Sequence, residues 1–147
     1  MTETFQALNA AVADGRVRRL GVSNFDVPLL QQAMQLSNTP IMANQVRYNL
    51  CSREYVRNGV LEFCQTHGIA LTAYSPFKNN VLHHPVIANV AQRHGVSTAQ
   101  VAIQWLVRQP QVITIPKSLN KAHLQENLDA LQLTLTDADI AELEQIS

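Results

Sequence analysis

The chain has 147 residues, of which 46% are hydrophobic, which is enough for one domain with a substantial core. Lys and Arg number 11, Asp and Glu also number 11, and neither sign forms a block, so we expect no nucleic-acid partner. No stretch approaches the roughly 18 apolar residues that span a bilayer, and the first residues do not resemble a signal peptide. Composition therefore predicts a single domain over residues 1–147, a cytoplasmic location and no membrane partner.

The first half of the chain alternates helical and strand patterns. Apolar residues at a spacing of three and four predict helices, and short β-rich runs bounded by turn residues predict strands. In chain order we expect a helix over 2–14, a strand over 18–22, a helix from 28 to 36, a strand over 41–46, a helix over 53–66 and a strand over 69–74.

The second half continues this alternation with paired helices. Ser97 and Gln100 have the spacing of a capping box, and Gly95 separates the helix that they begin from the one before it. Thr136 is a good N-cap for the last helix. The expected elements are helices over 84–94 and 97–108, a strand over 112–115, and helices over 121–131 and 137–146.

Four short strands that alternate with helices indicate βαβ units, a parallel sheet and an α/β fold. Each expected strand ends in unusual polar or aromatic residues. The four segments are Gly-Val-Ser-Asn-Phe at 21–25, Asn-Gln-Val-Arg-Tyr-Asn at 44–49, Ala-Tyr-Ser-Pro at 73–76 and Ile-Pro-Lys-Ser at 115–118.

Taken in this order, the four segments resemble the C-terminal half of the aldo-keto reductase family, in particular bacterial NADPH-dependent reductases of the diketogluconate reductase type. The resemblance covers nearly the whole chain. It implies a parallel (β/α) half barrel, made of the last four strands of a TIM-type (β/α)₈ barrel, in which functional groups lie at the carboxyl ends of the strands. It also implies a nicotinamide cofactor, usually NADPH, and reduction of a carbonyl to an alcohol.

The resemblance assigns the nicotinamide end of the cofactor to the first three strand ends. Ser23, Asn24 and Gln45 match residues that hydrogen-bond the carboxamide, and Tyr74 matches the aromatic residue that supports the ring. Each has an alternative, which is a local polar turn for Ser23 and Asn24, a different polar partner for Gln45 and core packing for Tyr74. Because neighbouring residues also match, we favour cofactor contact for all four.

The same resemblance assigns the phosphate groups of the cofactor to two later loops. Ser75 and Phe77 fall where the family approaches the pyrophosphate, although the family more often has Leu and Gly at the positions of Phe77 and Lys78. Lys117 and Ser118 match the clamp on the adenosine 2′-phosphate. A cation and a hydroxyl ahead of a helix N-terminus are suited to a phosphate independently of the resemblance.

The helix that follows supplies the expected contacts to the adenosine. Asn120 lies in the turn before this helix, and Glu126 and Asn127 match residues that bind adenine, although a solvated helix face explains these three equally well. His123 stands where the family commonly has an arginine. An imidazole is neither bidentate nor reliably charged, so the preference for NADPH is weakened and NADH remains possible.

The catalytic groups of the family, a Tyr, a Lys, an Asp and a His, come from its first four strands, and we assign no catalytic residue here. Tyr48, Tyr55 and Tyr74 have no neighbouring Lys and Asp in the sequence that would make them effective acids. We also expect no metal site. Cys51 and Cys64 are expected to be buried apolar residues, and the histidines outside the adenosine segment, His67, His83, His84 and His94, to be surface residues.

The favoured interpretation is a reductase fragment that binds NADPH and has little turnover alone, with a small carbonyl substrate only when an N-terminal half completes it. A second is a non-catalytic half barrel that forms a homo-oligomer or complements a separate N-terminal half, because its sheet edges would be exposed. A third is a regulatory protein that binds the nucleotide through Lys117 without chemistry.

Overall fold

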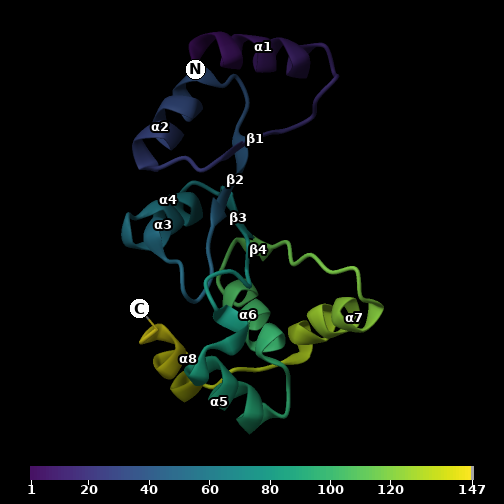
Figure 1. Cartoon of the computed structure of the whole chain (residues 1–147). Coiled ribbons are helices and arrows are strands. Elements are labelled where there is room, and N and C mark those ends of the chain that lie inside the picture. The colour runs from purple at the N-terminus through teal and green to yellow at the C-terminus, as the bar shows by residue number, and fades with distance from the viewer. Residues whose placement is uncertain (147) are drawn as a thin grey trace.

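The computed structural model describes residues 1–146, in which four parallel strands form one sheet with the order β1-β2-β3-β4 (Figure 1). The α/β class and the parallel sheet predicted from the sequence are therefore confirmed. In chain order the elements are α1 (Thr2–Ala13), β1 (Leu20–Ser23), α2 (Val27–Leu36), β2 (Ile41–Arg47), α3 (Glu54–Arg57), α4 (Val60–Thr66), β3 (Ala70–Tyr74), η1 (Val81–His83), α5 (Pro85–His94), α6 (Thr98–Val107), β4 (Val112–Thr114), α7 (Lys121–Asp129), η2 (Ala130–Gln132) and α8 (Asp137–Glu144).

The register of the sheet places one residue of each strand in a common row. Ser23 pairs with Gln45, Gln45 with Thr72, and Thr72 with Ile113. Neighbouring residues on a strand point to opposite faces of the sheet. Val112 and its partner Leu71 are buried, whereas Ile113 is 52% exposed. One face of the sheet thus packs into the core, while the other is open at β4.

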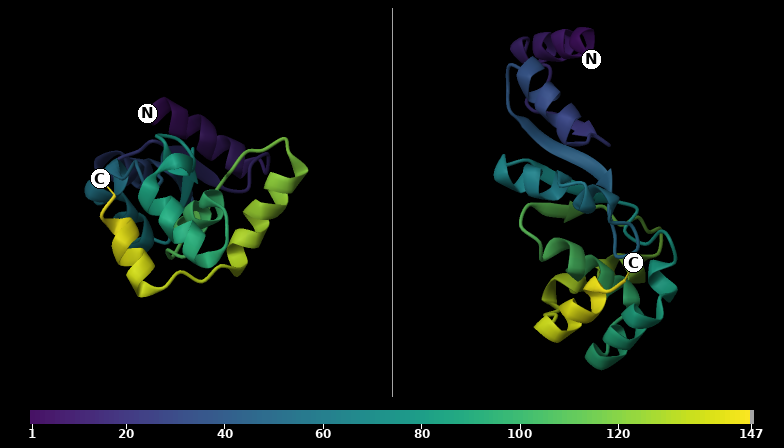
Figure 2. Two further views of the ribbon diagram at one scale, coloured as in Figure 1. Left: turned by 60° about the horizontal axis from the view of Figure 1, so that its bottom comes forward. Right: turned by 90° about the vertical axis from the view of Figure 1, so that its left-hand side faces the viewer.

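The helices spread along the sheet in an elongated arc, with α1 at one end and α5 and α8 at the other (Figure 2). The largest core cluster surrounds Trp105 of α6 and includes Leu71 of β3 and Leu143 of α8. Two smaller clusters lie toward the amino-terminal end, one around Phe5 and the other around Leu30. The sheet is therefore anchored most strongly at the β3–β4 side.

One predicted helix is wrong in its extent. The helix expected over 53–66 is two helices, α3 and α4, separated by Asn58 and Gly59. Gly59 has φ 76°, in the left-handed region that a glycine adopts without a clash of a Cβ atom. The apolar stripe continues across the break, which explains why periodicity alone predicted a single helix.

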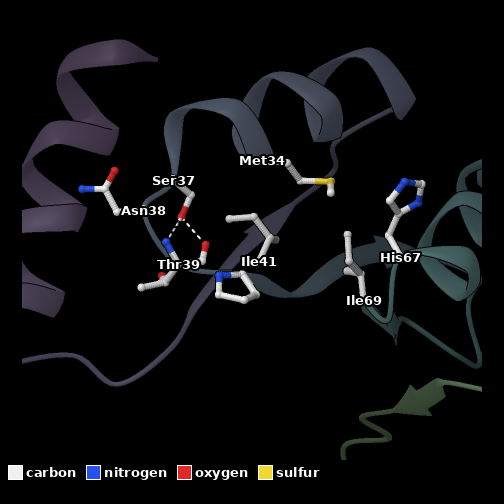
Figure 3. Close-up of a pocket in the computed structure, with 8 residues that line it drawn as sticks. Met34, Ser37, Asn38, Thr39, Ile41, His67 and Ile69 are labelled. Carbon is white, nitrogen blue, oxygen red and sulfur yellow. Dashed lines mark hydrogen bonds between the residues drawn. The ribbon is translucent and has the colours of Figure 1, made fainter.

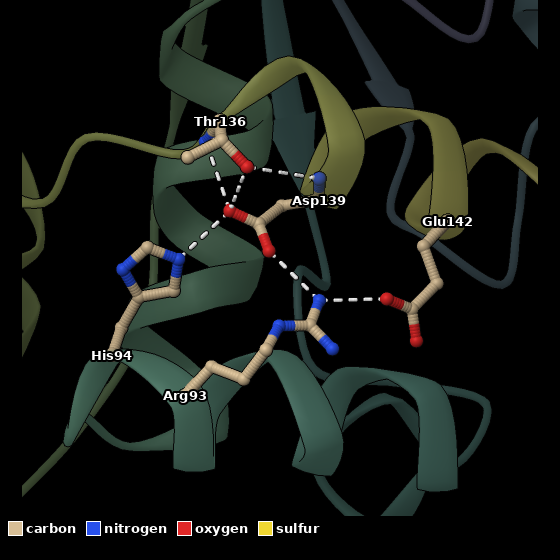
Figure 4. Close-up of polar contacts among 5 residues, drawn as sticks. All are labelled: Arg93, His94, Thr136, Asp139 and Glu142. Carbon is tan, nitrogen blue, oxygen red and sulfur yellow. Dashed lines mark hydrogen bonds and ion pairs between the residues drawn. The ribbon is translucent and has the colours of Figure 1, made fainter.

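The two N-terminal caps predicted from the sequence, a capping box at α6 and an N-cap at α8, are both present. The box of Ser97 and Gln100 at α6 is present. At α8 the N-cap is Thr136, as expected, and Asp139 completes a capping box that the sequence analysis did not include. Asp139 has a second role, because its carboxylate also accepts hydrogen bonds from Arg93 and His94 on α5, each at 2.8 Å (Figure 4).

This network corrects the expectation that His94 is a surface residue. Its side chain is only 22% exposed and contacts Asp139, whereas His67 and His83 are exposed as expected. His84 is partly buried, and its Nδ1 atom has no hydrogen-bond partner in the described part of the chain. Arg93 also contacts Glu142 at 2.6 Å, so α5 and α8 are joined by a network of ion pairs.

The two cysteines differ in burial. Cys64 is fully buried, and burial raises the pKa of its thiol to about 11. Cys51 is only partly buried, so the expectation of full burial is wrong for this residue, although burial raises the pKa of its thiol as well. Within residues 1–146 no helix has the length and hydrophobicity needed to cross a bilayer, and no cluster of three potential metal ligands occurs.

Candidate functional site

The carboxyl ends of β1, β2 and β3 bring together four of the predicted residues, Ser23, Asn24, Gln45 and Tyr74, which we call the strand-end rim. The Ser23 hydroxyl and the Asn24 N–H both donate to the carbonyl oxygen of Gln45, each at 2.9 Å. The Tyr74 hydroxyl donates to the Asn24 Oδ1 at 3.1 Å. The side-chain amide of Gln45 is half-buried and has no hydrogen-bond partner among residues 1–146. The rim therefore combines an ordered set of hydrogen bonds with an amide that is available to a ligand.

One rim residue, Asn24, and the residue that follows Tyr74 have an unusual backbone conformation. Asn24 has φ 59° and Ser75, the residue after Tyr74, has φ 57°. Asn tolerates this left-handed region better than most residues, whereas a Ser there is uncommon. Backbone strain of this kind persists only where surrounding contacts hold it, and it is concentrated at functional sites.

Two buried asparagines provide those contacts, and the sequence analysis did not recognise their role. Asn44, which is fully buried, donates to the carbonyl oxygen of Phe25 at 2.9 Å and accepts from its N–H at 3.4 Å. Asn49, also fully buried, donates to the carbonyl oxygen of Ser75 at 2.8 Å. Both belong to the segment 44–49, but only tertiary contacts show that they hold the loops after β1 and β3.

Besides Phe77, five other predicted residues line a hollow of about 330 Å³ beside α7, which we call the α7 hollow. These residues are Lys117, Ser118, His123, Glu126 and Asn127. Lys117 and His123 are exposed and the other three are partly buried. The structure thus places a cation, a hydroxyl, an imidazole, a carboxylate and an amide around one opening.

Asn120 does not line this hollow. Its side chain accepts a hydrogen bond from the Ala122 N–H at 2.9 Å, and so caps the N-terminus of α7. The Ser118 hydroxyl accepts from the Asn120 N–H at 3.0 Å, which orders the turn before the helix. The described contacts of Asn120 are therefore those of a helix cap.

The opposite wall of the α7 hollow comes from residues that the sequence analysis did not assign to a site. Ser97, Thr98 and Ala99 at the start of α6 line it, together with Leu82. The capping box at Ser97 marked the start of α6, but nothing in the sequence showed that this helix faces α7. Only the packing of the two helices in space reveals this wall.

The segment after β3 connects the rim with the α7 hollow. Ser75 follows Tyr74 directly and is fixed by Asn49, and Phe77, two residues later, lines the hollow. Lys78 is exposed and is not among the residues that line it. Residues 75–77 therefore link Tyr74 to the α7 hollow along the chain.

A hollow of similar volume, about 340 Å³, lies away from all these residues (Figure 3). Met34, Ile41, His67 and Ile69 line it, at the amino ends of β2 and β3. In parallel α/β folds ligands bind at the carboxyl ends of the strands. The position of this hollow therefore gives no support to a role in the same site.

Two tyrosines in the segment after β2, Tyr48 and Tyr55, have raised pKa values. Burial raises the pKa of Tyr48 to about 12, which outweighs the effect of its hydrogen bond to Gln109. Burial, together with the nearby Tyr74 and acidic side chains, also raises the pKa of Tyr55, although Arg47 opposes this. An effective general acid requires a shift in the opposite direction.

Comparison with known proteins identifies the family of the chain. The Aldo/keto reductase family matches the chain over residues 1–147. The chain is 35% identical to the methylglyoxal reductase of Escherichia coli (strain K12), with 97% of this chain and 52% of the relative covered. It is 33% identical to an uncharacterized oxidoreductase of Bacillus subtilis (strain 168), with 99% and 51% covered. The chain thus spans about half the length of these relatives.

Solved structures are similar over the same extent. A thermostable aldo-keto reductase in complex with the inhibitor epalrestat has a TM-score of 0.94 and 38% identity, with 99% of this chain and 54% of that chain covered. An aldo-keto reductase from Klebsiella pneumoniae in complex with NADPH has a TM-score of 0.88 and 33% identity, with 99% and 53% covered. The chain therefore belongs to the aldo/keto reductase family.

Proposed function

We propose that this chain is the cofactor-binding part of an NADP(H)-dependent reductase that converts a carbonyl to an alcohol. The observation that carries the proposal is the shared edge of the sheet, where Asn24, Gln45 and Tyr74 converge and from which residues 75–77 lead to the α7 hollow. Two similar solved structures from Klebsiella pneumoniae are complexes with NADP and NADPH, which supports a nicotinamide dinucleotide as the ligand.

The side chains present are suited to such a dinucleotide. Gln45 offers a free amide beside a hydroxyl and the amide of Asn24, and a carboxamide needs both donors and acceptors. Lys117 and Ser118 offer a charge and a hydroxyl for phosphate, and Glu126 and Asn127 offer polar atoms for a base. The polar side chains are therefore neutral at the rim, where the carboxamide would bind, and include a cation at the α7 hollow, where the phosphate would bind.

When bound, a reduced nicotinamide supplies a hydride to the carbonyl carbon. The residues of this chain hold and orient it. Ser23, Asn24 and Gln45 would bind the carboxamide, and Tyr74 would support the ring. Lys117 and Ser118 would bind the phosphate of the adenosine, with His123 lining the same hollow. His123 is a weaker phosphate ligand than an arginine would be. The site should therefore favour NADPH over NADH by less than a site with an arginine at this position.

The proposal assigns protonation of the product to a group outside this chain. Tyr48 and Tyr55 have raised pKa values, and Tyr74 is engaged with Asn24. We propose that a separate N-terminal half supplies the proton donor and completes the pocket for a small carbonyl substrate. The chain alone would then bind the cofactor with little turnover.

Exposed apolar residues support this completion of a barrel. Ile113 and Ile115 at β4 are 52% and 48% exposed, and Leu124 and Leu128 of α7 are 45% and 63% exposed. They lie at the last strand and its following helix, where an eight-stranded barrel would continue. Apolar surface at a sheet edge favours association. The chain in this proposal is thus a half barrel with four strands of a (β/α)₈ fold.

A titration with NADPH tests the cofactor assignment. We expect saturable binding that Lys117→Ala weakens by about 10- to 100-fold, because a charge-assisted contact to phosphate is lost. Lys121→Ala is the matched control, since Lys121 is exposed at the start of α7 but does not line the hollow. Equal affinity in wild type and Lys117→Ala would contradict the assignment.

Completion by another half requires its own experiment. NADPH oxidation with assorted aldehydes should be near zero for the purified chain and should appear on co-expression with an N-terminal half from a relative. The alternative is a non-catalytic half barrel that pairs with a second copy of itself about a two-fold axis. Light scattering that shows a stable homodimer, together with no gain of activity on co-expression, would favour this alternative.

A further inference from the structure

A third hollow, of about 400 Å³, lies at the carboxyl end of β2 and contains none of the residues assigned above. We call it the arginine hollow. Three arginines line it, together with neutral polar side chains that include those of Ser52, Asn58 and Asn79. The three arginines are Arg47, Arg53 and Arg57.

One arginine is a fixed part of the wall. Arg53 is paired with the Glu144 carboxylate at 2.7 Å, and it also donates to the carbonyl oxygens of Leu143 and Leu50. Its guanidinium lies 4.9 Å from the centre of the Trp105 ring. The charge of Arg53 is therefore already balanced, and its position is set by the core and by α8.

The other two arginines have unbalanced charges. Arg47 and Arg57 are exposed, and neither forms an ion pair with any side chain of the described chain. Glu54 is the acidic residue that lines the hollow. One carboxylate facing two unpaired guanidinium groups leaves a net positive charge inside a concave site, which concentrates anions.

The arginine hollow adjoins the strand-end rim. Arg47 is the register partner of Tyr74, and its guanidinium lies 6.0 Å from the centre of the Tyr74 ring. Arg47 thus lines the hollow, and its guanidinium lies over the ring that we propose supports the nicotinamide. A ligand held here would have its other end beside the reacting part of the site.

We propose that the arginine hollow binds a small anion, the carboxylate or phosphate group of a carbonyl substrate, through Arg47 and Arg57. Guanidinium groups recognise both anions through paired hydrogen bonds. The hydroxyl of Ser52 accepts a hydrogen bond from the Asn79 side chain at 2.5 Å. These two residues form a polar part of the wall of the hollow. The substrate part of this inference rests on the proposed function, whereas binding of the anion itself does not.

Calorimetric titration of the whole chain with succinate, and separately with inorganic phosphate, tests the site at constant ionic strength. We expect saturable binding that the double variant Arg47→Ala/Arg57→Ala weakens at least about tenfold. Both side chains are exposed, so the variant should fold normally. Arg16→Ala is the control, since Arg16 is an exposed arginine paired with Asp14 far from this hollow. No saturable binding, or equal binding in wild type and double variant, would overturn the proposal.

The fluorescence of Trp105, the single tryptophan, reports where the anion binds because Arg53 joins the ring to the wall of the hollow. A change in its emission that saturates with the calorimetric signal supports the site. A change that persists in the double variant counts against it.

Two further titrations separate the sources of the anion and the two proposals. If the anion belongs to a substrate, saturating NADPH should tighten the binding of 2-oxoglutarate but not that of phosphate. An equal effect on both, or no effect on either, would show that the hollow binds a free anion and not a substrate. Lys117→Ala should leave succinate binding unchanged. Succinate binding without any NADPH binding would therefore contradict the proposed function while the anion site remained.

Discussion

The strand-end rim and the α7 hollow differ in how firmly the fold holds them. At the rim, Asn24 and Tyr74 are fixed by hydrogen bonds to each other and to the backbone of β2, above a buried layer that includes Asn44. The α7 hollow lies against a helix in which no residue is fully buried, and Lys117 and His123 are exposed. The proposed cofactor explains this difference, because a reacting ring must be oriented within narrow limits, whereas a phosphate needs mainly charge.

Removing the support of the rim should have the largest effect. Asn44→Ala leaves both the N–H and the carbonyl oxygen of Phe25 without a partner, so we expect the free energy of unfolding to fall by about 2–3 kcal/mol. Urea denaturation measures this loss. Asn89→Ala, at an exposed position of α5, is the control and should change it by less than about 0.5 kcal/mol. A similar small change for Asn44→Ala would show that the rim does not depend on this layer.

Loss of the aromatic ring of Tyr74 should have the next largest effect, which is on the affinity for NADPH. Tyr74→Leu removes the aromatic face, and we expect NADPH affinity to fall roughly five- to tenfold in a fluorescence titration. Tyr74→Phe retains the ring and loses only the hydrogen bond to Asn24, so its affinity should stay within about twofold. Equal losses in the two variants would assign the effect to that hydrogen bond instead of the ring.

At the α7 hollow, one substitution should raise the affinity for the cofactor instead of lowering it. His123→Arg supplies a bidentate cation, and we expect NADPH affinity to rise about three- to fivefold with little change for NADH. Gln125→Arg adds the same charge to α7 outside the hollow and should raise neither affinity by more than about twofold. An equal gain for both cofactors in His123→Arg would mean that a general field, not the 2′-phosphate, is responsible.

Local chemistry in the sequence predicted much of this architecture. The polar segments 21–25 and 44–49 follow β-rich runs, and a parallel sheet places such segments at one edge, so the grouping of Asn24, Gln45 and Tyr74 could be expected. Capping residues such as Ser97 marked helix starts correctly because a cap depends only on its neighbours in the chain.

Features that depend on distant segments were beyond the sequence. Asn49 reads as a loop residue until its bond to Ser75, 26 residues away, is seen. Ser97 faces α7 only because two helices pack together, and Arg47 is an ordinary strand residue until Arg57 is brought near it. The break at Gly59 was missed for a local reason. The apolar residues on either side of it keep helical spacing, so the pattern predicted one continuous helix.

The double role of Asp139 has a consequence for behaviour in acid. Burial opposes ionisation of this carboxyl group, yet hydrogen bonds from Arg93, Thr136 and His94 outweigh it and hold its pKa well below the ordinary value. Its contribution to stability is therefore present above the ordinary pKa of about 4 and is lost progressively as the pH falls below it, because the unfolded chain then takes up a proton more readily than the folded one. Mild acidification should leave α8 docked on α5, and circular dichroism should detect its release only in strong acid. Asp139→Asn should lose that late transition and start from a lower stability at neutral pH.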